Sequence, residues 1–161
     1  MTDIWDELKP LFSGAPNVYP EVDIIDLTPQ QHATCLNYLF NRARECSFQF
    51  RLRRDNKLAV IAPSPNVVID AIQKEEVVGA MMFTFPPMPT IVVYAHYKDT
   101  LTISYGRDEW DAMTVLMFFD LLSQLVSLAP GARIVPDNVN FTYKQRRVFM
   151  KMWQAFHYEN A

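Results

Sequence analysis

The chain has 161 residues, 50% of them hydrophobic, which is enough to bury one core in the size range of single domains. Its formal net charge of -3 gives no general attraction to nucleic acid or to an anionic membrane surface. We therefore predict a single domain that spans residues 1–161.

Cysteine content and hydropathy indicate where the protein works. Cys35 and Cys46 are too few for a disulfide framework, and neither lies in a C-x-x-C pair. The first residues contain no charged segment followed by an apolar run, so we expect no signal peptide. The apolar segment around Phe118 is interrupted well short of the roughly 20 residues that span a bilayer. We expect a cytoplasmic protein without a membrane span.

The first third of the chain predicts a short helix, a strand and a long helix. Residues 4–12 are amphipathic and contain Pro10, which should shorten or kink their helix. Residues 22–27 have the composition of a strand. Thr28 and Gln31 then form a capping box around Pro29, which predicts a helix that continues to about residue 45.

The middle third predicts strands around a short helix. Apolar and polar residues alternate over 48–53, and a turn at Asp55-Asn56 leads to 58–62, so these two segments predict a hairpin. Ser64-Pro65 indicates the start of a short helix. Residues 77–85 and 91–97 predict two further strands, so that three neighbouring antiparallel strands precede the last part of the chain.

The last third predicts a strand, a long helix, a second strand and a final helix. Residues 101–105 alternate as a strand does, and residues 132–135 form a second strand after Pro130-Gly131. The helix between them, starting at Asp111, carries its apolar residues at helical spacing and predicts a βαβ unit. The apolar stripe of that helix consists of Met113, Leu116, Met117, Leu121, Leu125 and Leu128, and the polar stripe of Asp120, Ser123, Gln124 and Ser127.

A second capping box, Thr142 with Gln145, starts the last helix. Together the elements predict an α+β fold with a single mixed, largely antiparallel sheet packed by helices.

This order of elements, with a charged turn before Val78-Gly79-Ala80, resembles the GNAT family of acyl-CoA-dependent N-acyltransferases over roughly the C-terminal half of the chain. In that family a Q/R-x-x-G-x-G/A loop holds the pyrophosphate of coenzyme A at a helix N-terminus. The resemblance implies an acetyl-CoA or other acyl-CoA cofactor on the loop that runs from Arg107 to Ala112, and an amine as acceptor. It also implies a catalytic role for Glu76 as general base and for Tyr143 as general acid.

The residues also support a second hypothesis, a non-enzymatic protein-binding or regulatory module on a similar frame. Trp110 replaces the central glycine of the loop, and Asp108, Glu109 and Asp111 would repel a pyrophosphate. An open loop at Arg107 would favour the acyl donor, whereas a Trp110 that fills the gap would favour a binding protein.

Two groups of basic residues offer surfaces for a protein partner. The first contains Arg51, Arg53 and Arg54, and the second contains Lys144, Arg147 and Lys151. The acidic total and the missing glycine-aromatic RNA-binding motif argue against sequence-specific nucleic-acid binding. The three histidines, His32, His96 and His157, fit no metal or triad spacing, and we expect them to be ordinary polar or half-buried side chains.

Overall fold

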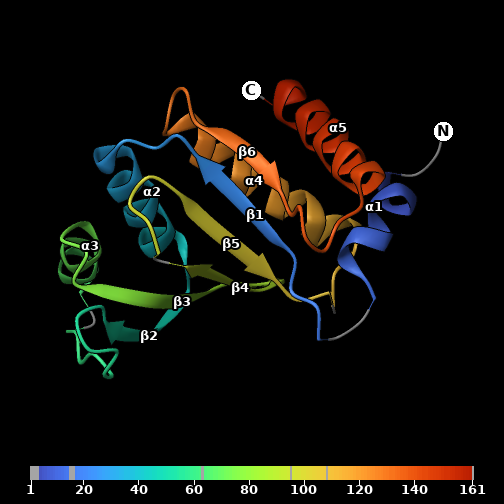
Figure 1. Cartoon of the computed structure of the whole chain (residues 1–161). Helices are drawn as coiled ribbons and strands as arrows, with labels where there is room; N and C mark the ends of the chain where they lie inside the picture. Colours follow the sequence, from blue (N-terminus) through green and yellow to red (C-terminus); the bar gives the residue numbers. More distant parts are fainter. Residues whose placement is uncertain (1–3, 15–16, 63, 95, 108, 161) are drawn as a thin grey trace.

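The computed structural model describes residues 4–14, 17–62, 64–94, 96–107 and 109–160, which form five helices and six strands (Figure 1). In chain order these are α1 (Ile4–Phe12), β1 (Glu21–Ile25), α2 (Pro29–Arg42), β2 (Glu45–Leu52), α3 (Pro65–Gln73), β3 (Val77–Phe85), β4 (Met88–Tyr94), β5 (Leu101–Tyr105), α4 (Ala112–Ser127), β6 (Arg133–Pro136) and α5 (Tyr143–Glu159).

The strands form one sheet in the order β2-β3-β4-β5-β1-β6, and all its pairings are antiparallel. The prediction of an α+β fold with a largely antiparallel sheet is therefore confirmed, and the neighbouring strands β3 and β4 pair antiparallel. The predicted mixture of parallel and antiparallel pairs is wrong.

The position of β1 explains this difference. The predicted strand-helix-strand unit is present as β5-α4-β6, but β1 lies between its two strands and pairs with both (Figure 1). Glu21 of β1 faces Ser104 of β5, and Val22 faces Pro136 of β6. Consequently β5 and β6 run in the same direction without pairing to each other. Since Val22 and Ile24 are fully buried, β1 suits an interior position in the sheet, with a strand on each side.

The predicted hairpin between residues 48–53 and 58–62 is also corrected. β2 pairs with β3 along its whole length, from Glu45 opposite Thr84 to Leu52 opposite Val77. The segment after the turn makes only an isolated bridge, between Leu58 and Arg51. The pairing with β3 and the bridge to Leu58 lie on opposite edges of β2, so residues 57–59 cover only the last part of its outer edge.

Helix starts agree closely with the sequence. The Thr28 hydroxyl accepts from the Gln31 N–H at 3.1 Å while the Gln31 side chain accepts from the Thr28 N–H at 2.9 Å. Thr142 and Gln145 form the same pair of bonds at the start of α5. Ser64 is the N-cap of α3 as predicted, but its side chain makes no capping bond.

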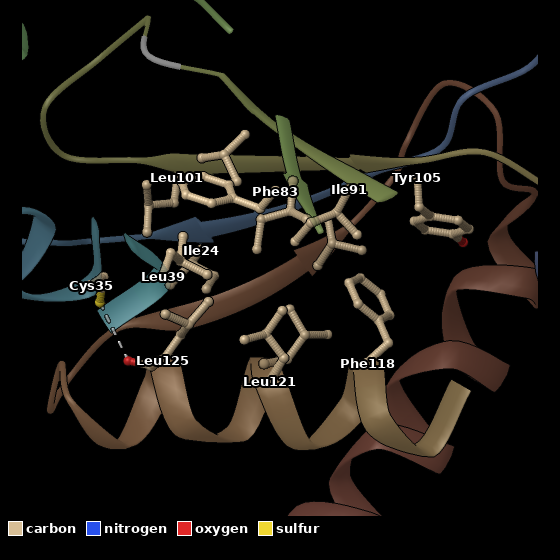
Figure 2. Close-up of a cluster of buried hydrophobic side chains, with 14 of the residues drawn as sticks. Ile24, Cys35, Leu39, Phe83, Ile91, Leu101, Tyr105, Phe118, Leu121 and Leu125 are labelled. Carbon is tan, nitrogen blue, oxygen red and sulfur yellow. Dashed lines mark hydrogen bonds between the residues drawn. The ribbon is translucent and has the colours of Figure 1, made fainter. Parts of the chain in front are cut away.

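The core lies between the sheet and the helices, and α4 contributes much of it (Figure 2). Leu121 and Leu125 point toward the sheet as predicted. Met113 and Leu116, assigned to the same buried stripe, are instead 57% and 39% exposed. Ser123, assigned to the solvated stripe, is buried. Because α4 is apolar around most of its circumference, it has a second apolar face in addition to the one on the sheet.

Gly79 is required where β2 and β3 approach each other closely. Its φ is +153°, and a Cβ built there would lie 2.1 Å from the Gln49 carbonyl oxygen of β2. We predict that Gly79→Ala lowers the free energy of unfolding by about 2–3 kcal/mol, because the added methyl must push the paired strands apart. Urea titration of both proteins measures the difference.

Gly106→Ala is the matched control. A Cβ at position 106 would meet only Tyr19, at an ordinary 3.8 Å, so this substitution should change stability by less than about 0.5 kcal/mol. Equal stabilities of the two variants would contradict the close approach at Gly79.

Candidate functional site

Trp110 fills the space between the end of β5 and the start of α4. Its side chain is 8% exposed, and its indole N–H donates to the Gly106 carbonyl at 2.6 Å. The ring packs against Phe12, Tyr105 and Phe118, with centroid separations of 5.1, 5.6 and 5.5 Å. The Tyr105 hydroxyl in turn donates to the Leu11 carbonyl at 3.1 Å. Aromatic packing therefore closes this loop onto α1.

The N-terminus of α4 carries its own carboxylate. The Thr114 N–H donates to Asp111 Oδ1 at 2.8 Å, and the Asp111 N–H donates to the Thr114 hydroxyl at 2.9 Å. The Thr114 hydroxyl also donates to Asp111 Oδ1 at 2.9 Å. The bonds from the Thr114 N–H and hydroxyl to the carboxylate lower the pKa of Asp111, so its negative charge sits at the helix end where an anion would bind. Glu109 adopts a positive φ of 68°, and Asp108 lies outside the described residues.

Arg107 lies between the segment after α1 and the start of α5. Its guanidinium carbon is 5.9 Å from the centroid of the Phe141 ring, and a Cβ at Gly14 would be 3.3 Å from its Nη1. Its Nε is buried and has no hydrogen-bond partner among the residues that the structure describes. Ala112, the other residue predicted to bind a cofactor, is exposed on the first turn of α4.

The two residues predicted as catalytic lie at opposite ends of the sheet. Phe83 faces Ile91, which faces Tyr105, so the start of the Arg107 loop is level with the last part of β3. Glu76 precedes the first residue of β3 and is therefore ~24 Å away along the strands. Tyr143 starts α5, on the Arg107 side, where it is 68% exposed. The structure thus brings Tyr143 and Arg107 to one end and leaves Glu76 at the other.

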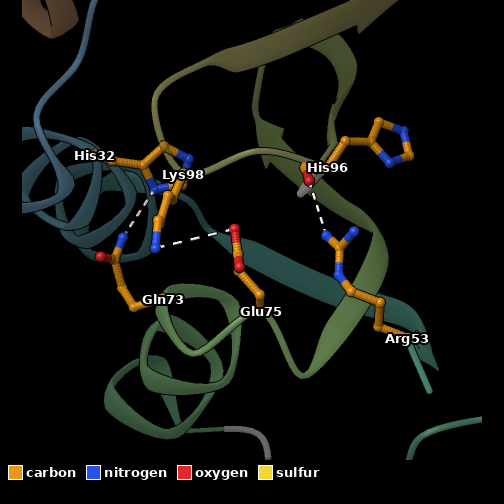
Figure 3. A network of polar contacts seen from close by, with 6 residues as sticks. All are labelled: His32, Arg53, Gln73, Glu75, His96 and Lys98. Atoms are coloured by element: carbon orange, nitrogen blue, oxygen red, sulfur yellow. Dashed lines mark hydrogen bonds and ion pairs between the residues drawn. The ribbon is translucent and has the colours of Figure 1, made fainter.

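Glu76 belongs to a polar surface with Arg53, Arg54 and Glu75, which line a hollow of about 500 Å³. Lys98 lies 3.9 Å from Glu75, and Arg53 donates to the His96 carbonyl at 2.9 Å (Figure 3). Acids and bases are present in similar number, so this surface is locally balanced in charge.

The two basic groups do not converge. Arg51 lies on β2 at one edge of the sheet, with Arg53 and Arg54 directly after it. Lys144, Arg147 and Lys151 lie on α5, which contacts β6 at the other edge. Each group is a separate surface.

A mostly apolar groove of about 520 Å³ lies on the part of the chain that the structure describes. It lies between α2 and α4 and is closed by the turn joining β3 to β4 and by α5. Its walls consist of Tyr38, Arg42, Phe85, Met88, Met113, Leu116, Met117, Asp120, Leu121 and Phe156.

The lining of this groove combines adaptable apolar side chains with one charge of each sign. Three methionines, Met88, Met113 and Met117, give it flexible and polarisable walls. The Arg42 guanidinium lies 5.8 Å from the centroid of the Tyr38 ring. Among the described residues, neither Arg42 nor Asp120 forms an ion pair. Both charges are therefore accessible to a bound molecule.

The sequence pattern did not predict this groove, because it indicated that Met113 and Leu116 belong to the core. A usable signal was present, since the apolar residues of α4 are too many for one stripe. Val115, Phe118, Phe119 and Leu122 face the interior in addition to Leu121 and Leu125. Periodicity identified an apolar helix but could not say which of its two faces meets the sheet.

The cysteines add no second candidate for chemistry. Burial raises the pKa of both Cys35 and Cys46 to about 11, which keeps them as thiols. Within the described ranges, no three His, Cys, Asp or Glu side chains are placed to hold a metal ion. None of the described helices is sufficiently long and apolar to cross a membrane.

Comparison of the chain with models of protein families, with curated proteins and with solved structures finds no match. The function is therefore inferred from the geometry of the described residues.

His32 lies on α2 and is fully buried. Its Nδ1 is 3.4 Å from the Gln73 amide nitrogen (Figure 3). Burial lowers the pKa of His32, although backbone groups of Thr100 and Tyr97 and the charge of Asp99 act in the opposite direction. In the unfolded chain its pKa returns to about 6.5, so below this pH the unfolded state binds a proton that the folded state does not.

We predict that the contribution of His32 to the free energy of unfolding does not change with pH above pH 6.5. Below pH 6.5 this contribution falls as the pH falls, by up to about 1.4 kcal/mol per pH unit. Urea titrations between pH 5 and pH 8 measure the slope. His32→Gln should remove this contribution to the slope, whereas His96→Gln, at an exposed position, should retain it. The same slope in wild type and His32→Gln would contradict the assignment.

Proposed function

We propose that this protein is a non-enzymatic binding module whose groove accepts the apolar face of an amphipathic helix from a protein partner. The observation that carries the proposal is the second apolar face of α4, where Met113 and Leu116 remain 57% and 39% exposed above a groove of about 520 Å³. Exposed apolar clusters of this kind mark interaction surfaces, because leaving them in water costs free energy.

The shape of the groove supports a helix as occupant. Met113, Leu116, Met117 and Asp120 repeat at the three-to-four-residue spacing of one helix face, and Tyr38 and Arg42 do so on α2 opposite. Two helices with a trough between them are the usual receptor for a third helix, whose anchors recur at positions i, i+3, i+4 and i+7. The methionine walls can repack around such anchors.

The charges indicate the chemistry of the partner. Arg42 is a donor for a carboxylate, and Asp120 is an acceptor for a lysine or arginine. A partner helix whose apolar anchors are flanked by one acidic and one basic residue would form an ion pair with Arg42 and another with Asp120. A purely apolar ligand would leave the two charges partly desolvated without a partner, which is unfavourable.

The acyltransferase hypothesis stays a prediction, and it has less support than the groove. Trp110 fills the loop, and Asp111 places a carboxylate at the helix end where pyrophosphate would bind. The distance along the sheet between Glu76 and Tyr143 would prevent one amine from contacting both.

A designed peptide tests the groove directly. We predict that an amphipathic helix of about 15 residues, with leucine anchors, one terminal glutamate and one terminal lysine, binds saturably. Met113→Glu should weaken binding at least about tenfold, because the partner would have to bury a carboxylate against its leucines. Fluorescence anisotropy of the labelled peptide gives both dissociation constants.

Val139→Glu is the control, since Val139 is 85% exposed and lies outside the groove. It should bind the peptide as the wild type does. Equal weakening by both substitutions, or no binding by the wild type, would contradict the proposal.

Acetyl-CoA separates the two hypotheses. We expect no rise in melting temperature at millimolar acetyl-CoA, because Trp110 and Asp111 occupy the predicted coenzyme loop. A ligand at roughly 100 times its dissociation constant would add about 2.7 kcal/mol of stability. Stabilisation that is lost in Arg107→Ala would instead support the acyltransferase.

A further inference from the structure

The outer edge of β2 is only half covered. Odd-numbered residues of β2 direct their backbone N–H and C=O groups to β3. Arg53, which directly follows β2, continues this pattern, because its N–H donates to the Glu76 carbonyl at 2.9 Å. Even-numbered residues direct theirs outward. The Phe50 carbonyl accepts from Ala59 N–H at 3.0 Å, and Leu52 N–H donates to the Lys57 carbonyl at 2.7 Å.

The remainder of this edge is open. By the same alternation, the N–H and C=O groups of Cys46 and Phe48 face outward. The segment after Ala59 leaves the edge, and among the described residues no backbone hydrogen bond joins Val60 or Ile61 to β2. Unpaired groups on an edge strand are a template for a further strand.

A cavity lies directly beside the open edge. It has a volume of about 270 Å³ and is lined by side chains of β2, including Phe48 and Phe50, and by residues 58–61. Within that segment Leu58 is 65% and Val60 97% exposed. An added strand would therefore find an apolar recess for a side chain next to the backbone groups it pairs with.

The chain segment that contains β2 is rich in basic residues, although Arg53 and Arg54 share a hollow with Glu75 and Glu76. Between residues 42 and 57 lie six basic residues and two acids. Arg51, Arg54 and Lys57 are exposed close to the edge, and in the described part of the chain the only ion pair among these three is the 3.8 Å contact between Arg54 and Asp55. An incoming strand that extends from Cys46 and Phe48 toward the Arg51 end of β2 would bring its carboxylates toward these basic residues.

We infer that β2 is a docking edge for an extended acidic segment of a partner protein, which adds as a strand beside Cys46 and Phe48 and places an apolar side chain in the neighbouring cavity. Backbone pairing supplies affinity, while the cavity and the basic residues supply selectivity for alternating apolar and acidic residues. Nucleic acid lacks a ladder of N–H and C=O groups and would use only the charge. The inference is independent of the helix-binding groove, because it uses the sheet edge.

The experiment uses the full chain and a labelled peptide of about eight residues in which glutamate and valine alternate, at low salt. We expect saturable binding and slower hydrogen exchange at the Cys46 and Phe48 amides. The same peptide N-methylated at every amide keeps its side chains and charge but has no N–H to pair, and it should bind at least about tenfold more weakly.

Charge variants complete the test. The triple variant Arg51→Gln, Arg54→Gln, Lys57→Gln should weaken binding about tenfold, and the matched triple variant Lys144→Gln, Arg147→Gln, Lys151→Gln on α5 should not. The inference is overturned if the peptide does not bind, if the methylated peptide binds equally well, if the two amides gain no protection, or if the two triple variants behave alike.

Discussion

Backbone pairing of β1 with both β5 and β6 is the constraint on which the arrangement of the whole sheet depends. Val22 and Ile24 are fully buried in this interior strand. The Tyr105 N–H donates to the Pro20 carbonyl at 3.1 Å, and the Glu21 N–H donates to Asp137 Oδ2 at 2.9 Å. The start of β1 is therefore anchored to the ends of β5 and β6, and α4 crosses from one to the other over the strand between them.

This insertion fills the place where a site would otherwise form. In sheets with neighbouring parallel strands, ligands bind in the crevice beyond the strands' carboxyl ends. Here the chain entering β1 occupies the gap between those ends. Burial alone would raise the pKa of Asp137, but hydrogen bonds from Asn140, Glu21 and Val139 lower this pKa overall. The Asp137 carboxylate therefore stabilises the turn after β6. Trp110 closes the adjacent loop in the same way.

The surfaces best suited to bind a partner therefore lie elsewhere on the molecule. The loop after β5 is closed by Trp110, and the Asp137 carboxylate after β6 is hydrogen-bonded beside a hollow of about 230 Å³. In contrast, the groove between α2 and α4 has the exposed Met113 and two charges outside any described ion pair. The β2 edge likewise retains backbone groups that face solvent. The proposed helix binding and strand addition use these two surfaces, which the packed core holds in place.

Local signals in the sequence were sufficient for most elements but not for their neighbours. Both threonine capping boxes predicted helix starts correctly, because the bonds between Thr28 and Gln31, or Thr142 and Gln145, form within one turn. Pairing of β1 with β5 joins residues about 80 positions apart, as in Glu21 and Ser104, and no local pattern specifies it. The groove was missed for a similar reason, because which face of α4 meets the sheet is decided by tertiary packing.

The sequence did identify Trp110 as the residue on which the choice of function depends, although only the fold could place its ring in the cluster with Phe12 and Tyr105. Replacement of a glycine by a large aromatic residue is a visible departure, but whether it fills a gap or faces solvent depends on α1, which lies about 100 residues earlier.

Methionine-methyl NMR tests the central claim most directly, because three of the eight methionines line the groove and Met81 lies in the core. Titration with the amphipathic helical peptide should shift the methyl resonances of Met88, Met113 and Met117 and leave that of Met81 unchanged, while acetyl-CoA should shift none of them. Binding of the peptide without any change at the three groove methionines would contradict the account.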